Sequence, residues 1–107
     1  MTEPIQDVKA EFFRAMAHPA RVRILELLRD GERSVGELTD ALELESSHVS
    51  QQLGVLRRAN LVRSRKEGTS VFYSLGDARI AQVLALSKEI LLAYLTEAAG
   101  WLADDRR

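Results

Sequence analysis

The 107-residue sequence predicts a mainly helical domain with one small β-hairpin. Three observations support this fold class. Apolar residues recur every three or four positions through residues 5–60, which is the period of amphipathic helices. Between residues 61 and 76 the period changes to two on either side of a glycine, as in a hairpin. Residues 78–103 return to the helical period. A chain of this length forms a single domain, residues 1–107.

The composition is that of a folded globular protein. Hydrophobic residues make up 46% and charged residues 29% of the chain, which is typical of a domain with one apolar core. No apolar run approaches the roughly 18 residues of a membrane-spanning helix, so we expect no membrane contact. The acidic N-terminus lacks the apolar segment of a signal peptide, which indicates a cytoplasmic location.

Residues suited to catalysis or metal binding are scarce. The chain has no cysteine and only two histidines, His18 and His48, so disulfides, thiol redox chemistry and thiolate metal sites are excluded. No glycine-rich loop could hold a phosphate, and no adjacent motifs supply a nucleophile with its base. We therefore expect no enzymatic activity, no cofactor and no bound metal ion.

Two helices are predicted before residue 31. The first covers residues 5–17 and ends at His18-Pro19, because proline disrupts a helix interior but suits the first turn of the next helix. His18 is expected to cap or pack at this junction. The second helix extends to about Arg29, and Gly31 ends it, since glycine readily adopts a positive φ.

Residues 34–60 predict a helix-turn-helix. Ser34 and Glu37 have the spacing of a capping box, in which each side chain bonds the backbone N–H of the other at the start of a helix. This helix runs through Leu42. A tight turn leads into a second helix, residues 46–60, which has one apolar stripe. The stripe consists of Val49, Leu53 and Leu56.

Residues 61–76 predict a β-hairpin directly after the second of these helices. Two β-prone runs, residues 61–65 and 71–75, flank a turn that contains Gly68. A helix-turn-helix followed by a basic hairpin is a winged helix-turn-helix, in which the hairpin is the wing. The predicted order is four helices, two strands and a last helix.

The charge distribution favours double-stranded DNA as the partner. The net charge is only −1, but residues 46–76 carry five basic side chains and one acidic side chain. A basic patch on the helix-turn-helix and wing is the electrostatic footprint of a DNA-binding domain. The alternative is a winged helix that binds proteins, but such a module does not need its basic residues concentrated there.

Small polar side chains on a helix can reach base edges in the major groove, whereas basic side chains mostly bind phosphates. The expected base contacts are Ser47, His48 and Gln51. The expected contacts with the DNA backbone are Ser50, Arg57, Arg58, Arg63, Arg65 and Lys66.

The last helix, residues 78–103, predicts a homodimer. Asp77 can cap its start, and aliphatic side chains cover most of its circumference. A helix that is apolar nearly all round needs burial on more than one side, and so small a domain covers only one. We expect a second copy to cover the rest, with residues 5–17 and 78–103 as the dimerisation helices. The expected interface residues are Phe12, Val83, Ile90, Leu91, Tyr94 and Leu95.

The motif Phe-x-Ala-Met-Ala-His-Pro-Ala-Arg-x-Arg-Ile-Leu-x-Leu-Leu, residues 13–28, resembles the second-helix signature of the ArsR/SmtB repressors. The resemblance continues in order through Ser-Val-Gly-Glu-Leu (34–38), Val-Ser-Gln-Gln-Leu (49–53), Val-Leu-Arg-Arg-Ala-Asn-Leu-Val (55–62) and Tyr-Ser-Leu (73–75). It covers about residues 8–95. It implies a homodimeric winged helix-turn-helix repressor that binds an inverted-repeat operator and leaves the DNA when an inducer, often a metal ion, binds.

The sequence departs from this family at its metal ligands. The positions that match the family's Cys-x-Cys site hold Ser34 and Gly36. The positions that match its second metal site hold Asp77, Arg79, Ile90 and Ala93. Zinc requires three or four N, S or O ligands, so we expect no metal sensing at either site. The alternatives are a small organic effector of unknown identity between the paired last helices, the titration of His48, or competition by other regulators.

Overall fold

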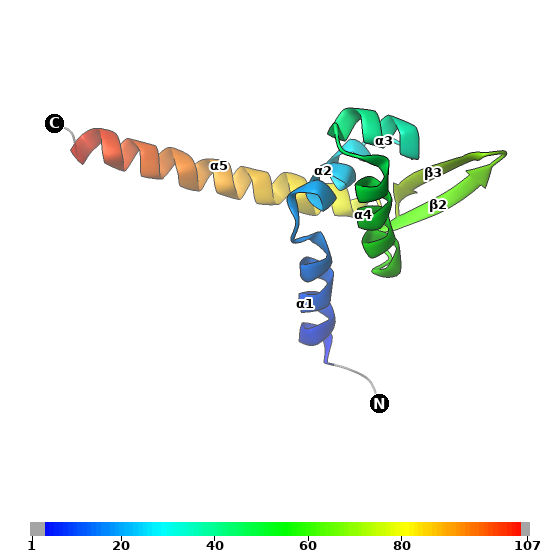
Figure 1. Cartoon of the computed structure of the whole chain (residues 1–107). Coiled ribbons are helices and arrows are strands. Elements are labelled where there is room, and N and C mark those ends of the chain that lie inside the picture. The colour runs from blue at the N-terminus through cyan, green and yellow to red at the C-terminus, as the bar shows by residue number, and fades with distance from the viewer. Residues whose placement is uncertain (1–3, 106–107) are drawn as a thin grey trace.

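The computed structural model describes the backbone of residues 4–105 and the side chains of residues 4–100. A small helical body carries the hairpin on one side, while the last helix projects from the other side and the first helix extends below (Figure 1). The elements are α1 (Ile5–Met16), α2 (Pro19–Leu27), β1 (Arg33–Ser34), α3 (Val35–Leu42), α4 (Ser46–Arg58), β2 (Val62–Glu67), β3 (Ser70–Leu75) and α5 (Arg79–Asp105).

The junction between α1 and α2 confirms the predicted cap. The Nδ1 atom of His18 accepts a hydrogen bond from the backbone N–H of Ala20 at 3.1 Å, and Pro19 occupies the first helical position. The end of α2 lies two residues before the expected Arg29, because the chain turns over the next residues into Gly31, which has a φ of +139°.

The helix-turn-helix also begins as predicted. The Oγ atom of Ser34 accepts from the N–H of Glu37, and the Oε1 atom of Glu37 accepts from the N–H of Ser34, each at 3.1 Å. This capping box fixes the start of α3. Helix α4 ends at Arg58 rather than residue 60, because Asn60 adopts a left-handed φ of 62° and redirects the chain into the wing.

The sheet has three strands in the order β1-β3-β2, all antiparallel, where the sequence predicted two. Strand β1 was missed because two residues show no period. The hairpin strands are also longer than expected. Their turn is only Gly68-Thr69, with Glu67 paired to Ser70, and Gly68 has a φ of +61°. This φ is easily adopted by glycine.

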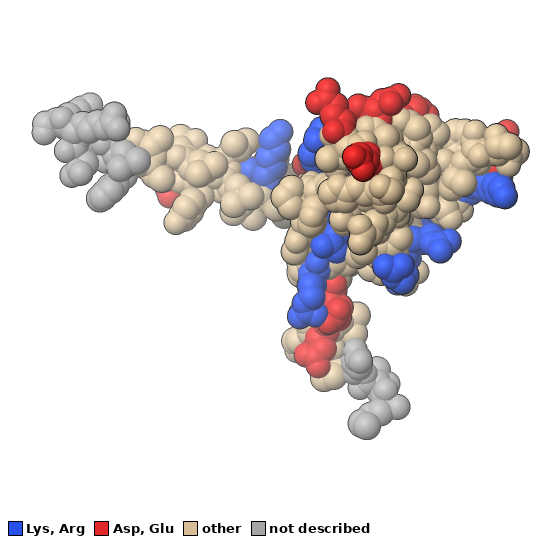
Figure 2. Space-filling view, in the orientation of Figure 1, with Lys and Arg blue, Asp and Glu red and all other residues tan. Residues whose placement is uncertain are grey.

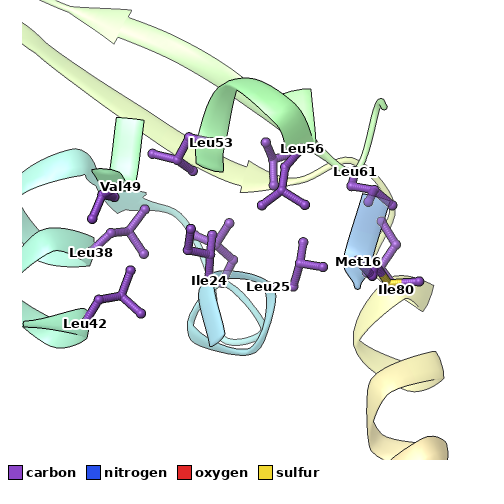
Figure 3. Packing of buried hydrophobic residues seen from close by; sticks show 12 residues of the cluster. Met16, Ile24, Leu25, Leu38, Leu42, Val49, Leu53, Leu56, Leu61 and Ile80 are labelled. Atoms are coloured by element: carbon purple, nitrogen blue, oxygen red, sulfur yellow. The ribbon is translucent and has the colours of Figure 1, made fainter. Parts of the chain in front are cut away.

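The core fastens α4 to the rest of the helical body. Aliphatic side chains of α2 face those of α3 and α4, and Met16 and Ile80 close the cluster from α1 and α5 (Figure 3). Burial of each large aliphatic side chain contributes about 1.5–3 kcal/mol to folding. The residues with no exposed surface are Ile24, Leu25, Leu38, Val49, Leu53 and Leu56.

Helix α5 starts beside the core and then leaves it. Its first backbone N–H, of Arg79, donates to Oδ1 of Asp77 at 2.8 Å, so the predicted cap is confirmed. Ile80 is buried and Leu84 is half-buried, but every residue from 85 to 100 is exposed. A helix of 27 residues is about 40 Å long at 1.5 Å per residue. Most of that length therefore lacks cover from its own domain.

Candidate nucleic-acid interface

Helix α4 presents one face to the core and the other to solvent. The predicted stripe of Val49, Leu53 and Leu56 is fully buried. The buried face also includes Gln52, which is 8% exposed and whose Oε1 atom has no hydrogen-bond partner within residues 4–100. Sequence reasoning missed Gln52 because glutamine is normally a surface residue. Its spacing, three residues after Val49 and four before Leu56, already placed it on that face.

The outward face of α4 carries two of the three predicted base-reading residues, Ser47 and Gln51, together with Ser50, a predicted backbone contact. Ser47, Ser50 and Gln51 are exposed, and their spacing of three and four residues puts them side by side on the helix. His48 is half-buried, with its ring 6.2 Å from the ring of His18 and nearly perpendicular to it. The fold thus brings together two histidines that the sequence separates by thirty positions.

The C-terminal turn of α4 carries Arg57 and Arg58, both exposed. Basic side chains at this position also stabilise the helix dipole. The guanidinium of Arg58 lies back along the helix, since a Cβ added to Gly54 would lie 3.4 Å from its Nη1 atom. Arg58 and Arg21 border a surface hollow of about 560 Å³ between α1, α2 and α4.

The wing carries the other predicted backbone contacts, and one of them differs from expectation. Arg63 and Lys66 are exposed and form no ion pair with the side chains of residues 4–100. The sequence prediction treated Arg65 in the same way. In the structure its guanidinium is instead held by Glu32 at 2.6 Å and by Glu67 at 2.7 Å. The reason is the order of the sheet, in which the side chain of Arg65 on β2 reaches across β3 to Glu32, the residue before β1.

The charges divide between two sides of the domain. Figure 2 shows Lys and Arg below α4 and the wing, and Asp and Glu gathered at the top around α3, with further acidic side chains on α1 at the bottom. The acidic group includes Glu37, Asp40 and Glu43, which are all exposed. A polyanion is therefore attracted to the edge that holds the end of α4 and the wing.

Ser34 and Asp77, two of the positions that correspond to metal ligands in the resembled family, already make hydrogen bonds within the chain. The Oγ atom of Ser34 caps α3. The carboxylate of Asp77 accepts from the guanidinium of Arg79 at 2.7 and 3.0 Å, and these hydrogen bonds hold the pKa of Asp77 well below its usual range. Within the part of the chain that the structure describes, no group of three or more His, Cys, Asp or Glu side chains could hold a metal ion.

The predicted dimer surface is largely exposed. Val83 is 37% exposed, and the other predicted interface residues of α5 are more than half exposed: Ile90, Leu91, Tyr94 and Leu95. Phe12 differs, because it is half-buried against the core of its own chain. Its neighbour Phe13 is the outward ring, 56% exposed, and the two rings meet edge to face. Because the two residues are adjacent in the helix, their side chains face directions about 100° apart, so only one of them packs on the core.

A helix-turn-helix followed by a basic wing defines this protein as a winged helix-turn-helix DNA-binding protein. The model of the arsR family of bacterial regulatory proteins matches residues 18–64. The chain is 49% identical to the uncharacterized HTH-type transcriptional regulator Rv0081 of Mycobacterium tuberculosis, over 98% of this chain and 93% of that protein. The chain therefore belongs to the arsR family, and it is a transcriptional regulator rather than an enzyme, as predicted.

Other relatives include both an activator and a repressor of transcription. The transcriptional activator HlyU of Vibrio cholerae is 47% identical, over 68% of each chain. The biofilm growth-associated repressor of Agrobacterium fabrum is 41% identical, over 70% of this chain and 64% of that one.

Solved structures share the fold. The crystal structure of Rv0081 matches with a TM-score of 0.82, 49% identity and coverage of 92% of this chain and 99% of that one. The solution structure of the homodimeric winged helix-turn-helix DNA-binding domain Mb0332 of Mycobacterium bovis matches with a TM-score of 0.78 and 30% identity. The match covers 87% of this chain and 86% of that one. The winged helix-turn-helix prediction is thus confirmed.

Among the described residues, none of the helices combines the length and apolar character needed to cross a bilayer.

Proposed function

We propose that this regulator is a homodimeric repressor that binds an inverted-repeat operator. The observation that carries the proposal is the exposed polar face of α4 beside a basic wing, on a domain whose α5 projects with uncovered apolar side chains. A two-fold dimer presents two such faces, and two-fold symmetry in a protein matches an inverted repeat in DNA. The family resemblance favours repression over activation. We place the protein in the cytoplasm.

The roles of the side chains follow from their positions. Ser47, His48 and Gln51 read base edges from the N-terminal half of α4, where glutamine can pair with adenine through both amide atoms. Ser50 and the basic residues other than Arg65 bind the DNA backbone and position the helix. The basic residues in this group are Arg57, Arg58, Arg63 and Lys66. Arg65 is treated separately below, because its guanidinium is already occupied.

The dimer is supported by the surface of α5. The exposed aliphatic and aromatic side chains from Val83 to Leu95 form a surface that water would otherwise cover. Burial of apolar area contributes about 25 cal/mol per Å². The homodimeric state of Mb0332 agrees with this assembly. Phe13 of α1, which is 56% exposed, offers a second apolar surface for the dimer.

The test is selective binding of DNA by the whole protein. Fluorescence anisotropy with fragments from the protein's own upstream region should reveal one site bound far more tightly than random DNA. Its footprint should contain two half-sites whose centres lie about 10–10.5 base pairs, or a multiple of that, apart. Transcription from that promoter in vitro should fall when the protein is added.

The main alternative is a winged helix that binds another protein. Equal affinity for all fragments, lost completely at moderate salt, would favour that reading, because sequence-independent binding rests on phosphate contacts alone. If operator binding is intact but transcription rises, the protein recognises DNA as proposed and is an activator instead of a repressor.

A further inference from the structure

The side chain of Arg65 spans the full width of the three-stranded sheet. Arg65 lies on β2, opposite Phe72 of the central strand β3, and Phe72 lies near Ser34 of β1 on the other side. The guanidinium carbon sits 4.8 Å from the centre of the Phe72 ring. Beyond that ring it meets Glu32, which directly precedes β1. One side chain thus connects residues 33 positions apart in the sequence.

The contacts of Arg65 use its planar shape. Its Nε and Nη2 atoms donate to the two carboxylate oxygens of Glu32 at 3.1 and 2.6 Å, and its Nη1 atom donates to Oε2 of Glu67 at 2.7 Å. A bidentate guanidinium–carboxylate pair fixes direction as well as distance. The hydrogen bonds with Glu32 and then Glu67 raise the pKa of Arg65, and Arg65 lowers the pKa of Glu32. Two carboxylates flank this cation, which makes it a poor site for a phosphate.

Glu32, the partner of Arg65, lies next to a residue that is fixed to the body of the domain. Arg33, the neighbour of Glu32, pairs with Tyr73 of β3, and its Nε atom donates to the carbonyl of Leu27 at the end of α2 at 2.8 Å. Glu32 is therefore tied to the body of the domain rather than to a free loop. Holding Arg65 at Glu32 sets how the outer strand of the wing lies relative to that body.

The interaction energy of an exposed ion pair is small, so we expect the Arg65–Glu32 pair to orient the wing rather than to stabilise the fold. The side chains of Arg65 and Glu32 are 51% and 35% exposed, and ion pairs this exposed add little to global stability. A hairpin of two strands, each six residues long, has few other constraints at its tip. A contact across the sheet therefore acts mainly on the direction of the wing.

We propose that Arg65 is a positioning residue, which holds the wing at the angle needed for DNA through Glu32, and that it does not itself bind a phosphate. This inference takes one point from the proposed function, namely that the wing lies against DNA. Lys66, the next residue along, is the matched comparison, because it is exposed and unpaired within residues 4–100.

The experiment compares Arg65→Ala, Glu32→Gln, the double variant and Lys66→Ala in operator binding by fluorescence anisotropy. Arg65→Ala and Glu32→Gln should each weaken binding about two- to fivefold per wing, the range expected for a partly exposed ion pair. The double variant should be no weaker than either single variant, because both changes break the same pair. If Glu32→Gln binds the operator as tightly as the wild type or more tightly, Arg65 is a phosphate contact masked by Glu32 and the proposal is overturned.

A second readout needs no DNA, so it separates this inference from the proposed function. Amide hydrogen exchange in the free protein should accelerate at β1 and its partners on β3 in Arg65→Ala and Glu32→Gln, with Lys66→Ala unchanged. Unchanged exchange in the first two variants would show that the pair does not hold the wing. Thermal melts confirm that each variant is folded at the temperature of the measurement.

Discussion

The backbone N–H of Gly76 donates to the carbonyl of Leu61 at 2.9 Å, and this hydrogen bond closes the base of the wing. A Cβ at position 76 would lie 2.4 Å from the carbonyl oxygen of Asn60. That oxygen belongs to the backbone at the end of α4, so only a separation of the two segments makes room. Gly76→Ala should lower the free energy of unfolding by about 1–3 kcal/mol in urea denaturation. Gly100→Ala is the control, because its added Cβ meets nothing within 4 Å.

The start of α5 should show a pH-dependent contribution to stability. Hydrogen bonds from Arg79 lower the pKa of Asp77 in the folded protein, so the ionised carboxylate favours the folded state above the unfolded pKa of about 3.9. This contribution is lost as the pH falls below that value toward the folded pKa. The melting temperature of the wild type should exceed that of Asp77→Asn at pH 7, and the difference should shrink below about pH 4. A gap that stays constant from pH 7 to pH 3 would contradict this assignment.

The dimer can be tested on α5. Leu91→Glu places a charge in the proposed interface, so sedimentation should give monomers that no longer bind the operator. Ala93→Glu is the matched control, since at about 100° per residue position 93 faces away from Leu91 and shares its side with Glu89 and Glu97. A monomeric wild type at micromolar concentration would refute the dimer reading of this helix.

Base reading should depend on Gln51. Gln51→Ala should cost about 1–3 kcal/mol per half-site on the operator and relax the preference at one base position. Lys66→Ala should weaken binding to operator and random DNA alike and flatten the dependence of log affinity on log salt by about 0.9 per wing. The same pattern of losses for both variants on random DNA would contradict the division into base-reading and backbone residues.

Release of DNA should not depend on a metal ion at the two positions used elsewhere in the family. Asp77 is engaged by Arg79, and Ser34 supplies a single hydroxyl that already caps a helix. One carboxylate leaves a divalent ion largely hydrated and weakly bound. Titration of zinc, nickel, cobalt, cadmium and arsenite into a labelled operator complex should leave it intact. Dissociation at low micromolar metal that disappears in Asp77→Asn would refute the prediction.

The elements that the sequence predicted well are those with local causes. The capping box at Ser34 and the stripe from Val49 to Leu56 rest on neighbours within one or two helical turns, so spacing alone reveals them. Strand β1 and the partner of Arg65 depend on pairing across the sheet. Such long-range contacts leave no period in the sequence. The sequence therefore predicted the basic patch in outline. The ion pairs of Arg65 with Glu32 and Glu67 are known only from the structure.

The long α5 also links folding to protein abundance. From residue 85 to residue 100 every residue is exposed in the single chain, and an isolated helical segment of this length is marginal in water. In the proposed dimer the two copies cover each other's turns, so dilution removes that cover and destabilises this part of α5. Operator occupancy should consequently rise more steeply with the amount of protein than it would for a dimer that never separates.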